Sequence, residues 1–194
     1  MIKIFLDSSN IEEIKKWKDK VDGFTTNPTL MRKAGVTNYE KFCKEVLVEV
    51  PDKPVSFEVF ADDFDEMERQ ARIISSWGKN VYVKIPITNT KGEVSYKLIK
   101  KLLSEKIKVN VTAVTRQTSI GGLPIQDTPL IISYFAGRVA DTGENPMWTV
   151  PRIKDFFVKG EILWASPREV LNIYQAEEAG ADIITCSPEL LEKY

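Results

Sequence analysis

Lys84 is the residue of this sequence whose setting most suggests unusual chemistry, because it lies in the run Val83-Lys84-Ile85-Pro86. The chain contains no histidine, which removes the usual general base and the commonest metal ligand of enzymes. A lysine among apolar walls can lose its proton, and the free amine can attack a ketone to form an imine that serves as an electron sink. Cleavage of the carbon–carbon bond beside the imine then becomes feasible. Any catalysis by this chain is expected to use Lys, Asp, Glu, Tyr or bound water.

Further polar side chains are predicted to point into the same interior as Lys84. Alternate residues of a β-strand face opposite sides, so Val81, Val83 and Ile85 on one face leave Lys84 on the other. The same reasoning on the neighbouring strands gives an inward set made of Asp7, Asn27, Glu58, Lys84, Asn110 and Thr112. Any one of these residues alone could be a solvent-exposed residue at the end of a strand. Because all of them are predicted to face the same interior, a common site is favoured. A chain built only for stability would fill this interior with Val, Ile and Leu.

The inward set contains groups that could move protons. Glu58, directly or through one water, is placed to shuttle protons while an imine forms and hydrolyses, and Asp7 could accept a proton from a sugar hydroxyl. Asn27, Asn110 and Thr112 would hold hydroxyl groups and water. Both carboxylates also favour the charged form of the lysine, and the sequence leaves open whether desolvation outweighs this attraction.

The elements that must position these residues alternate between strands and helices. The predicted strands are Ile2–Asp7, Phe24–Asn27, Val55–Phe60, Val81–Pro86, Val109–Val114, Leu130–Phe135, Ile162–Ser166 and Asp182–Ser187. Helical periodicity covers Ile11–Trp17, Tyr39–Val48, Phe64–Trp77, Val94–Leu103, Val150–Phe157 and Glu169–Glu178. This alternation predicts parallel strands joined by right-handed crossovers.

A closed barrel is favoured over an open doubly wound sheet, because no Gly-rich phosphate loop follows the first strand. The prediction is an α/β fold, a single (β/α)₈ TIM barrel that occupies residues 1–194 as one domain with short connections. Barrel enzymes keep their active sites at the carboxyl ends of the strands, where the inward set lies. Between the fifth and sixth strands, Gly121, Gly122 and Pro124 leave room for only a stub of helix. Ala113 is expected to share the outer face of the fifth strand with Val109 and Val111.

Later strands end in residues suited to bind an anion. Ser133 and Arg138 accompany the sixth strand, and Ser166 and Arg168 follow the seventh. Arg and Ser at these strand ends fit phosphate capture in a barrel. An arginine on a solvated loop is the alternative for either Arg.

Composition excludes several other functions. Lys and Arg total 27 against 28 Asp and Glu, a net charge of −1 that does not favour nucleic acid as a partner. No apolar run reaches the length of a membrane span and no export signal follows Met1, so a soluble, cytoplasmic protein is expected. Cys43 and Cys186 form no CxxC motif and are expected to be buried thiols rather than a disulfide. Neither a metal nor another cofactor is expected, which disfavours a zinc-dependent aldolase.

Several segments, in the right order, resemble the transaldolase and fructose-6-phosphate aldolase family along nearly the whole chain. They are Phe5–Asn10, Thr25–Leu30, Val83–Pro86, Asn110–Thr112 and Phe135–Arg138. The resemblance implies a Schiff base on Lys84 and transfer of a dihydroxyacetone unit from a ketose phosphate to an aldose phosphate without a cofactor. It also implies that Phe135 helps to bind the substrate.

Two positions separate the branches of this family. Glu58 falls where transaldolases carry Glu and the aldolases carry Gln, and Phe135 falls where the aldolases carry a catalytic Tyr. Both features favour transaldolase chemistry. The chain departs from the family at Pro167, where Phe is usual, and at Tyr134, where Pro is usual. It also ends at Tyr194, without the family's closing C-terminal helical segment, which leaves acceptor identity and homo-oligomerisation open.

Two other functions remain as alternatives. One is a simple aldolase that releases free dihydroxyacetone. The other is a non-catalytic barrel that binds sugar phosphates. The inward set includes the charged residues Asp7, Glu58 and Lys84, although buried charges cost stability, and their presence favours catalysis.

Overall fold

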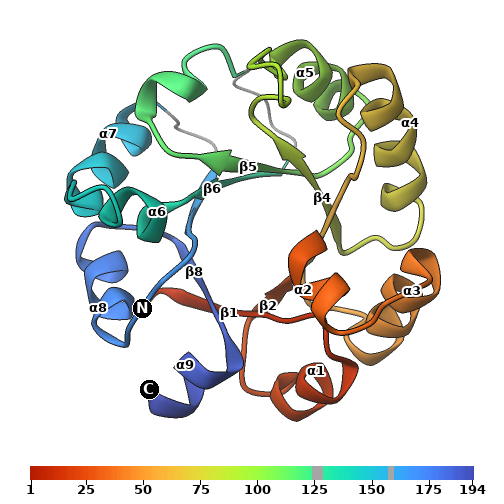
Figure 1. Ribbon diagram of the computed structural model, residues 1–194, viewed down its shortest axis with the longest axis horizontal. Helices are drawn as coiled ribbons and strands as arrows, with labels where there is room; N and C mark the ends of the chain where they lie inside the picture. Colours follow the sequence, from red (N-terminus) through yellow and green to blue (C-terminus); the bar gives the residue numbers. More distant parts are fainter. Residues whose placement is uncertain (124–128, 157–159) are drawn as a thin grey trace.

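In the residues that the structure describes, 1–123, 129–156 and 160–194, eight parallel strands close into a barrel in a computed structural model of the chain (Figure 1). The strands are β1 (Lys3–Asp7), β2 (Gly23–Thr25), β3 (Val55–Glu58), β4 (Val81–Pro86), β5 (Val109–Val114), β6 (Leu130–Tyr134), β7 (Glu161–Trp164) and β8 (Ile183–Cys186). Each strand pairs in parallel with the next, and β8 pairs with β1. The predicted (β/α)₈ fold is confirmed.

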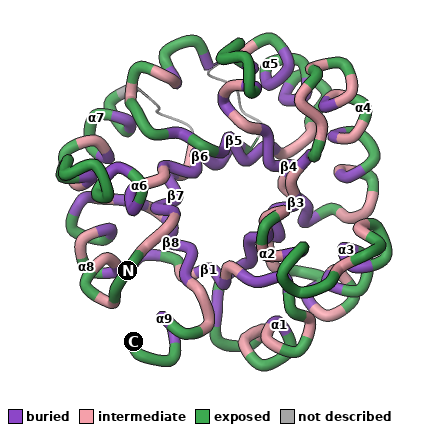
Figure 2. The backbone as a smooth tube through the Cα atoms, in the orientation of Figure 1, coloured by how far each residue is buried: buried purple, intermediate pink, exposed green. Residues whose placement is uncertain are grey.

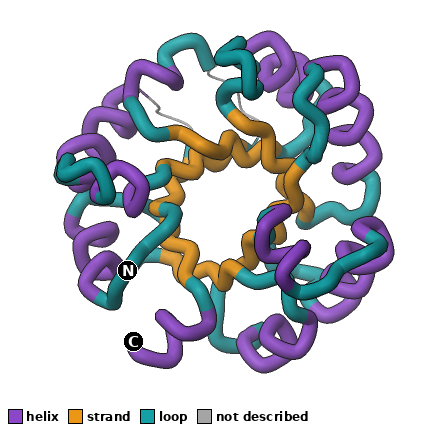
Figure 3. Tube along the Cα trace, in the orientation of Figure 1, coloured by secondary structure: helices purple, strands orange, loops and turns teal. Residues whose placement is uncertain are grey.

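Helices surround the ring of strands, except α2, which lies at the barrel opening (Figure 3). The helices are α1 (Ile11–Trp17), α2 (Pro28–Lys33), α3 (Tyr39–Glu49), α4 (Phe64–Ser75), α5 (Tyr96–Ser104), α6 (Ala136–Ala140), α7 (Thr149–Phe156), α8 (Leu171–Glu178) and α9 (Pro188–Lys193), with 3₁₀ turns η1 (Gln117–Ile120) and η2 (Pro146–Trp148). The six predicted helices are confirmed within a few residues, whereas α2, α6 and α9 were not predicted. Within the described part of the chain, none of these helices has the length and apolar character needed to cross a membrane.

Side-chain caps explain where several helices begin. The side-chain oxygen of Asn10 accepts a hydrogen bond from the backbone N–H of Glu12 at 2.9 Å, which starts α1 at the predicted place. Asn38 caps α3 in the same way, and Asp63 caps α4 with bonds from two backbone N–H groups. These caps satisfy N–H groups that have no partner inside the helix.

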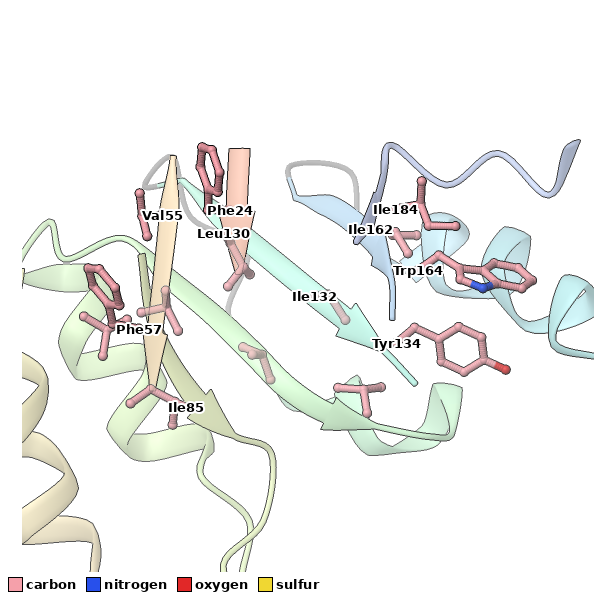
Figure 4. Packing of buried hydrophobic residues seen from close by; sticks show 14 of the residues in the cluster. Phe24, Val55, Phe57, Ile85, Leu130, Ile132, Tyr134, Ile162, Trp164 and Ile184 are labelled. Carbon is pink, nitrogen blue, oxygen red and sulfur yellow. The ribbon is translucent and has the colours of Figure 1, made fainter. Parts of the chain in front are cut away.

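The hydrophobic core forms two separate layers. The larger layer lies between strands and helices and contains Val83 and Ile85, as predicted from their alternation with Lys84. Figure 4 shows part of this outer layer, including Phe57 and Trp164. The smaller layer lies inside the barrel and consists of Phe5, Ile131, Leu163, Ala165 and Ile183. The strands are therefore covered on both faces. Figure 2 shows that most residues in the ring of strands are buried.

The fifth strand contains an irregularity that alternation did not predict. Its register with β6 shifts between Val111 and Val114, which is the mark of a bulge. Ala113 is exposed with a φ of 60°, so the prediction that it shares the outer face with Val111 is wrong. Val114 takes the place in the outer core instead. The bulge absorbs one residue while Thr112 stays buried.

The connection between β5 and β6 agrees with the prediction of a stub of helix. The 3₁₀ turn η1 is its helical part in the described residues. Pro124 lies outside the described residues, as does Phe157, the last residue of the predicted helix Val150–Phe157.

Candidate active site

A cavity of about 570 Å³ opens at the carboxyl ends of the strands. The predicted site residues that line it are Asp7, Asn27, Glu58, Lys84, Thr112, Ser133, Phe135, Arg138, Ser166 and Arg168. Asn110 is the exception, because it lies fully buried beneath the cavity. The structure thus brings together side chains from strands that are far apart in the sequence, at the end of the barrel where enzymes of this fold keep their active sites.

Lys84 is held at the wall of this cavity by two oxygens. Its Nζ lies 3.0 Å from Glu58 Oε2 and donates a hydrogen bond of 2.9 Å to the backbone carbonyl of Thr26. The pairing of β3 with β4 places Glu58 directly opposite Lys84, which explains why the two side chains meet. Only 7% of Lys84 is exposed. An amine with a carboxylate in contact can pass a proton to it and become a nucleophile.

Asp7 forms a separate polar group on the neighbouring side of the cavity. Thr25 Oγ1 donates to Asp7 Oδ1 at 2.8 Å, and Asn27 Nδ2 donates to Oδ2 at 3.3 Å. Burial raises the pKa of Asp7 above its ordinary value of 3.8, against the opposing attraction of the Lys84 charge. A carboxyl group whose pKa is raised is a stronger base when it is ionised, which suits it to accept a proton from a hydroxyl.

Asn27 lies outside its strand and connects two parts of the site. β2 ends at Thr25, so the prediction of a strand that reaches Asn27 is wrong by two residues. Asn27 Oδ1 accepts from the backbone N–H of Leu30 at 2.9 Å and thereby begins α2. Its Nδ2 remains free to donate to Asp7. As a consequence α2 lies over the barrel opening, and Lys33 at its end lines the cavity.

A chain of hydrogen bonds supports the floor of the cavity. Ser133 Oγ donates to Asn110 Oδ1 at 2.7 Å, and Asn110 Nδ2 donates to Ser56 Oγ at 3.0 Å. These contacts fix Ser133 without using Asn110 as a lining residue. Thr112 Oγ1 is buried and has no hydrogen-bond partner among the described residues. Because a buried hydroxyl without a partner is costly, Thr112 is suited to pair with a group brought in by a ligand.

The opposite side of the cavity carries the arginines. Arg138 lies on α6, the helix that begins directly after Phe135, and Arg168 follows Ser166 beyond β7. Gly137 allows the close approach of these segments, because a Cβ at this position would lie 1.7 Å from the carbonyl oxygen of Ser166. Arg168 does not stand alone, since its guanidinium donates to both carboxylate oxygens of Asp141.

Sequence reasoning missed other residues of this cavity. The hydroxyl groups of Thr25 and Thr185 lie 2.6 Å apart beside Asp7, and Lys33 adds a fourth basic side chain to Lys84, Arg138 and Arg168. Lys33 could have been found from Pro28, which directly follows the cap residue Asn27. Proline is common in the first turn of a helix, so the pair Asn27-Pro28 indicates the start of α2, which ends at Lys33. The family departures Tyr134 and Pro167 are not among the described lining residues. No group of three or more potential metal-ligating side chains occurs among the residues that the structure describes.

Comparison with known proteins identifies the family. A model of the "Transaldolase/Fructose-6-phosphate aldolase" family matches residues 4–194. The chain belongs to this family. The "Probable transaldolase" of Nitrosopumilus maritimus strain SCM1 is 37% identical over 199 residues, covering 99% of this chain and 86% of that protein. The "Probable transaldolase" of Lactiplantibacillus plantarum is 40% identical over 190 residues, covering 95% of this chain and 84% of its own length.

The transaldolase/fructose-6-phosphate aldolase relatives indicate an enzyme of the transaldolase or aldolase type. "Probable transaldolase 2" of Listeria monocytogenes, also 37% identical, covers 99% of this chain and 88% of that protein. A solved structure with a similar fold is orotidine 5'-monophosphate decarboxylase from Metallosphaera sedula, with a TM-score of 0.63 and 14% identity over 99% of this chain and 91% of that one. At this identity the likeness supports the barrel fold alone.

Proposed function

We propose that this protein is a transaldolase-like transferase, which moves a dihydroxyacetone unit between sugar phosphates through a Schiff base on Lys84. The observation that carries the proposal is the buried Lys84 amine, 3.0 Å from the Glu58 carboxylate, on a cavity that also holds two arginines. Family membership and the names of the relatives support the same chemistry.

The first step forms the imine. Glu58 accepts one proton from Lys84 Nζ, and the free amine attacks the C2 carbonyl carbon of a ketose phosphate. The resulting carbinolamine loses its hydroxyl as water when Glu58 returns the proton. The protonated imine then draws electrons from the adjoining C–C bond.

The second step breaks the sugar. The Asp7 carboxylate accepts the proton of the C4 hydroxyl, the C3–C4 bond breaks, and its electron pair moves into the imine to leave an enamine on Lys84. The departing fragment is an aldose phosphate. Burial raises the pKa of Asp7, which makes its carboxylate a better base for this task. Thr25 and Asn27 hold its two oxygens in place.

The third step transfers the retained unit. The enamine attacks the aldehyde carbon of a second aldose phosphate, Asp7 returns its proton to the new hydroxyl, and water hydrolyses the imine. Asn27, Thr112 and Ser133 would bind sugar hydroxyls, and Asn110 would support Ser133 through the hydrogen bond that it accepts from Ser133 Oγ. Arg138, Ser166 and Arg168 would bind the phosphate, and Phe135 would pack against the sugar chain between the two regions.

A coupled assay with a ketose phosphate tests the proposal, with and without an aldose phosphate acceptor. A transferase forms product quickly only when the acceptor is present, and Lys84→Met abolishes turnover. Lys79→Met is a matched control, because Lys79 is an exposed lysine paired with Asp52 away from the cavity. Release of free dihydroxyacetone without an acceptor would favour a simple aldolase. Substrate binding without turnover in the parent would favour a non-catalytic sugar-phosphate-binding protein.

A further inference from the structure

Asp141 is an acidic residue that pairs with Arg168, one of the two arginines of the cavity. It follows α6 as the C-terminal cap, one helical turn after Arg138. Its two carboxylate oxygens accept hydrogen bonds from Nε and Nη2 of Arg168, with the Nε–Oδ1 distance being 3.4 Å. A guanidinium that binds two oxygens in this way uses the geometry with which it binds phosphate.

Both arginines lower the pKa of Asp141. Hydrogen bonds from Arg168 are the main cause that lowers the pKa of Asp141, and the charges of Arg168 and Arg138 add to the effect. The side chains of Asp141 and Arg168 are 50% and 47% exposed, so the ion pair is in contact with water, while Arg168 also lines the cavity. An ion pair of this exposure is weak enough to exchange partners.

We propose that Asp141 is an internal competitor for the substrate phosphate, whose carboxylate occupies Arg168 until a phosphate monoester takes the guanidinium over. The inference rests on the proposed function, because it assumes that Arg138 and Arg168 bind the phosphate of the sugar. It adds a residue that lowers phosphate affinity instead of raising it.

This arrangement suits a transferase. Within one reaction cycle the phosphate of the departing aldose must leave the cavity, and the phosphate of the acceptor must enter it, while the dihydroxyacetone unit stays on Lys84. A site that held phosphate too tightly would slow this exchange. A resident carboxylate gives Arg168 an alternative partner at the moment of release.

The test measures binding of inorganic phosphate to the full chain by ³¹P NMR titration. Asp141→Asn keeps the shape of the side chain and removes its charge, so phosphate is expected to bind about two- to fivefold more tightly. Asp52→Asn is the matched control, because it removes the same charge from an exposed ion pair with Lys79. The control is expected to leave phosphate affinity unchanged.

Weaker or unchanged phosphate binding in Asp141→Asn would overturn the inference, because it would mean that Asp141 only supports the position of Arg168. Circular dichroism of each variant shows whether the fold is kept. In an Arg168→Met background, Asp141→Asn is expected to lose most of its gain. A gain of undiminished size there would also overturn the inference, since Asp141 would then act through the general field of the opening.

The titration needs no turnover, which separates it from the test of the proposed function. Failed transfer together with the predicted phosphate affinities would overturn the transferase proposal and leave the role of Asp141 standing. Absence of phosphate binding in both parent and Asp141→Asn would overturn the inference about Asp141 itself.

Discussion

The two sides of the barrel interior differ in chemistry. Strands β1 to β5 direct charged and polar groups inward, among them Asp7, Glu58 and Lys84. Strands β6 to β8 contribute mostly apolar side chains, such as Ile131, Leu163 and Ile183. The apolar side fills space and excludes water, and it thereby strengthens the electrostatic interactions of the polar side. The polar side gives up packing for chemistry, because buried charges seldom stabilise a fold as well as hydrophobic residues do.

Phe5 joins the two sides of the interior. It comes from β1, the strand that also carries Asp7, yet its ring belongs to the apolar cluster with Leu163. The ring fits because Gly23 on the paired strand has no side chain, and a Cβ there would lie 2.5 Å from the ring. Strand β1 therefore contributes a residue to each side of the interior, because Gly23 on β2 leaves space for the Phe5 ring.

The largest expected effect on stability comes from removing a buried side chain from the apolar side. Phe5→Ala removes a ring that is 1% exposed and should lower the free energy of unfolding by about 3–5 kcal/mol. Urea denaturation measures the change. Phe60→Ala is the control, because Phe60 is 52% exposed and its truncation should lower the free energy of unfolding far less. A loss of less than about 1 kcal/mol for Phe5→Ala would mean that the apolar side is not tightly packed.

A change on the polar side should affect activity most strongly. Glu58→Gln keeps the shape of the side chain but removes the proton carrier that lies 3.0 Å from Lys84 Nζ. The expected result is a fall in kcat of about 100-fold or more, measured in the transfer assay. Glu12→Gln on the exposed surface of α1 serves as the control. Full activity in Glu58→Gln would remove Glu58 from the proposed mechanism.

The contact between the two sides can be tested through Gly23. Gly23→Ala places a methyl group against the Phe5 ring and should cost about 1–3 kcal/mol of stability. The cost should shrink when Phe5→Ala is already present, which a double-mutant cycle would show. Gly121→Ala is the control, since its nearest neighbour would be 3.8 Å away. An equal cost in both backgrounds would contradict the contact.

The smallest expected effect is a gain in stability. Burial raises the pKa of Asp7, so its favourable contribution to folding is full below the ordinary value of 3.8 and is lost as pH rises through the raised pKa. At neutral pH the Asp7 charge therefore costs stability. Asp7→Asn should raise Tm by a few degrees at pH 7, flatten the dependence of Tm on pH, and reduce turnover. A lower Tm in the variant at pH 7 would contradict the account.

The alternation of residues along single strands correctly predicted which side chains point into the barrel on β3 and β4. It placed Glu58 and Lys84 on one face, and the parallel register of β3 with β4 then brings them together. The bulge at Ala113 was not predictable in this way, because it depends on how β5 pairs with β6. The ion pair of Asp141 with Arg168 joins residues that are 27 positions apart in the chain. Such contacts depend on the docking of short segments, for which local periodicity carries little information.

Borohydride reduction in the presence of a ketose phosphate tests the central claim most directly. The account predicts a covalent adduct of the dihydroxyacetone unit, found by mass spectrometry on the peptide that contains Lys84. Lys33 lines the same cavity and provides an internal comparison, because it is exposed at the opening instead of buried beside Glu58. An adduct on Lys33 instead, or no adduct on Lys84 across a panel of ketose phosphates, would contradict the claim.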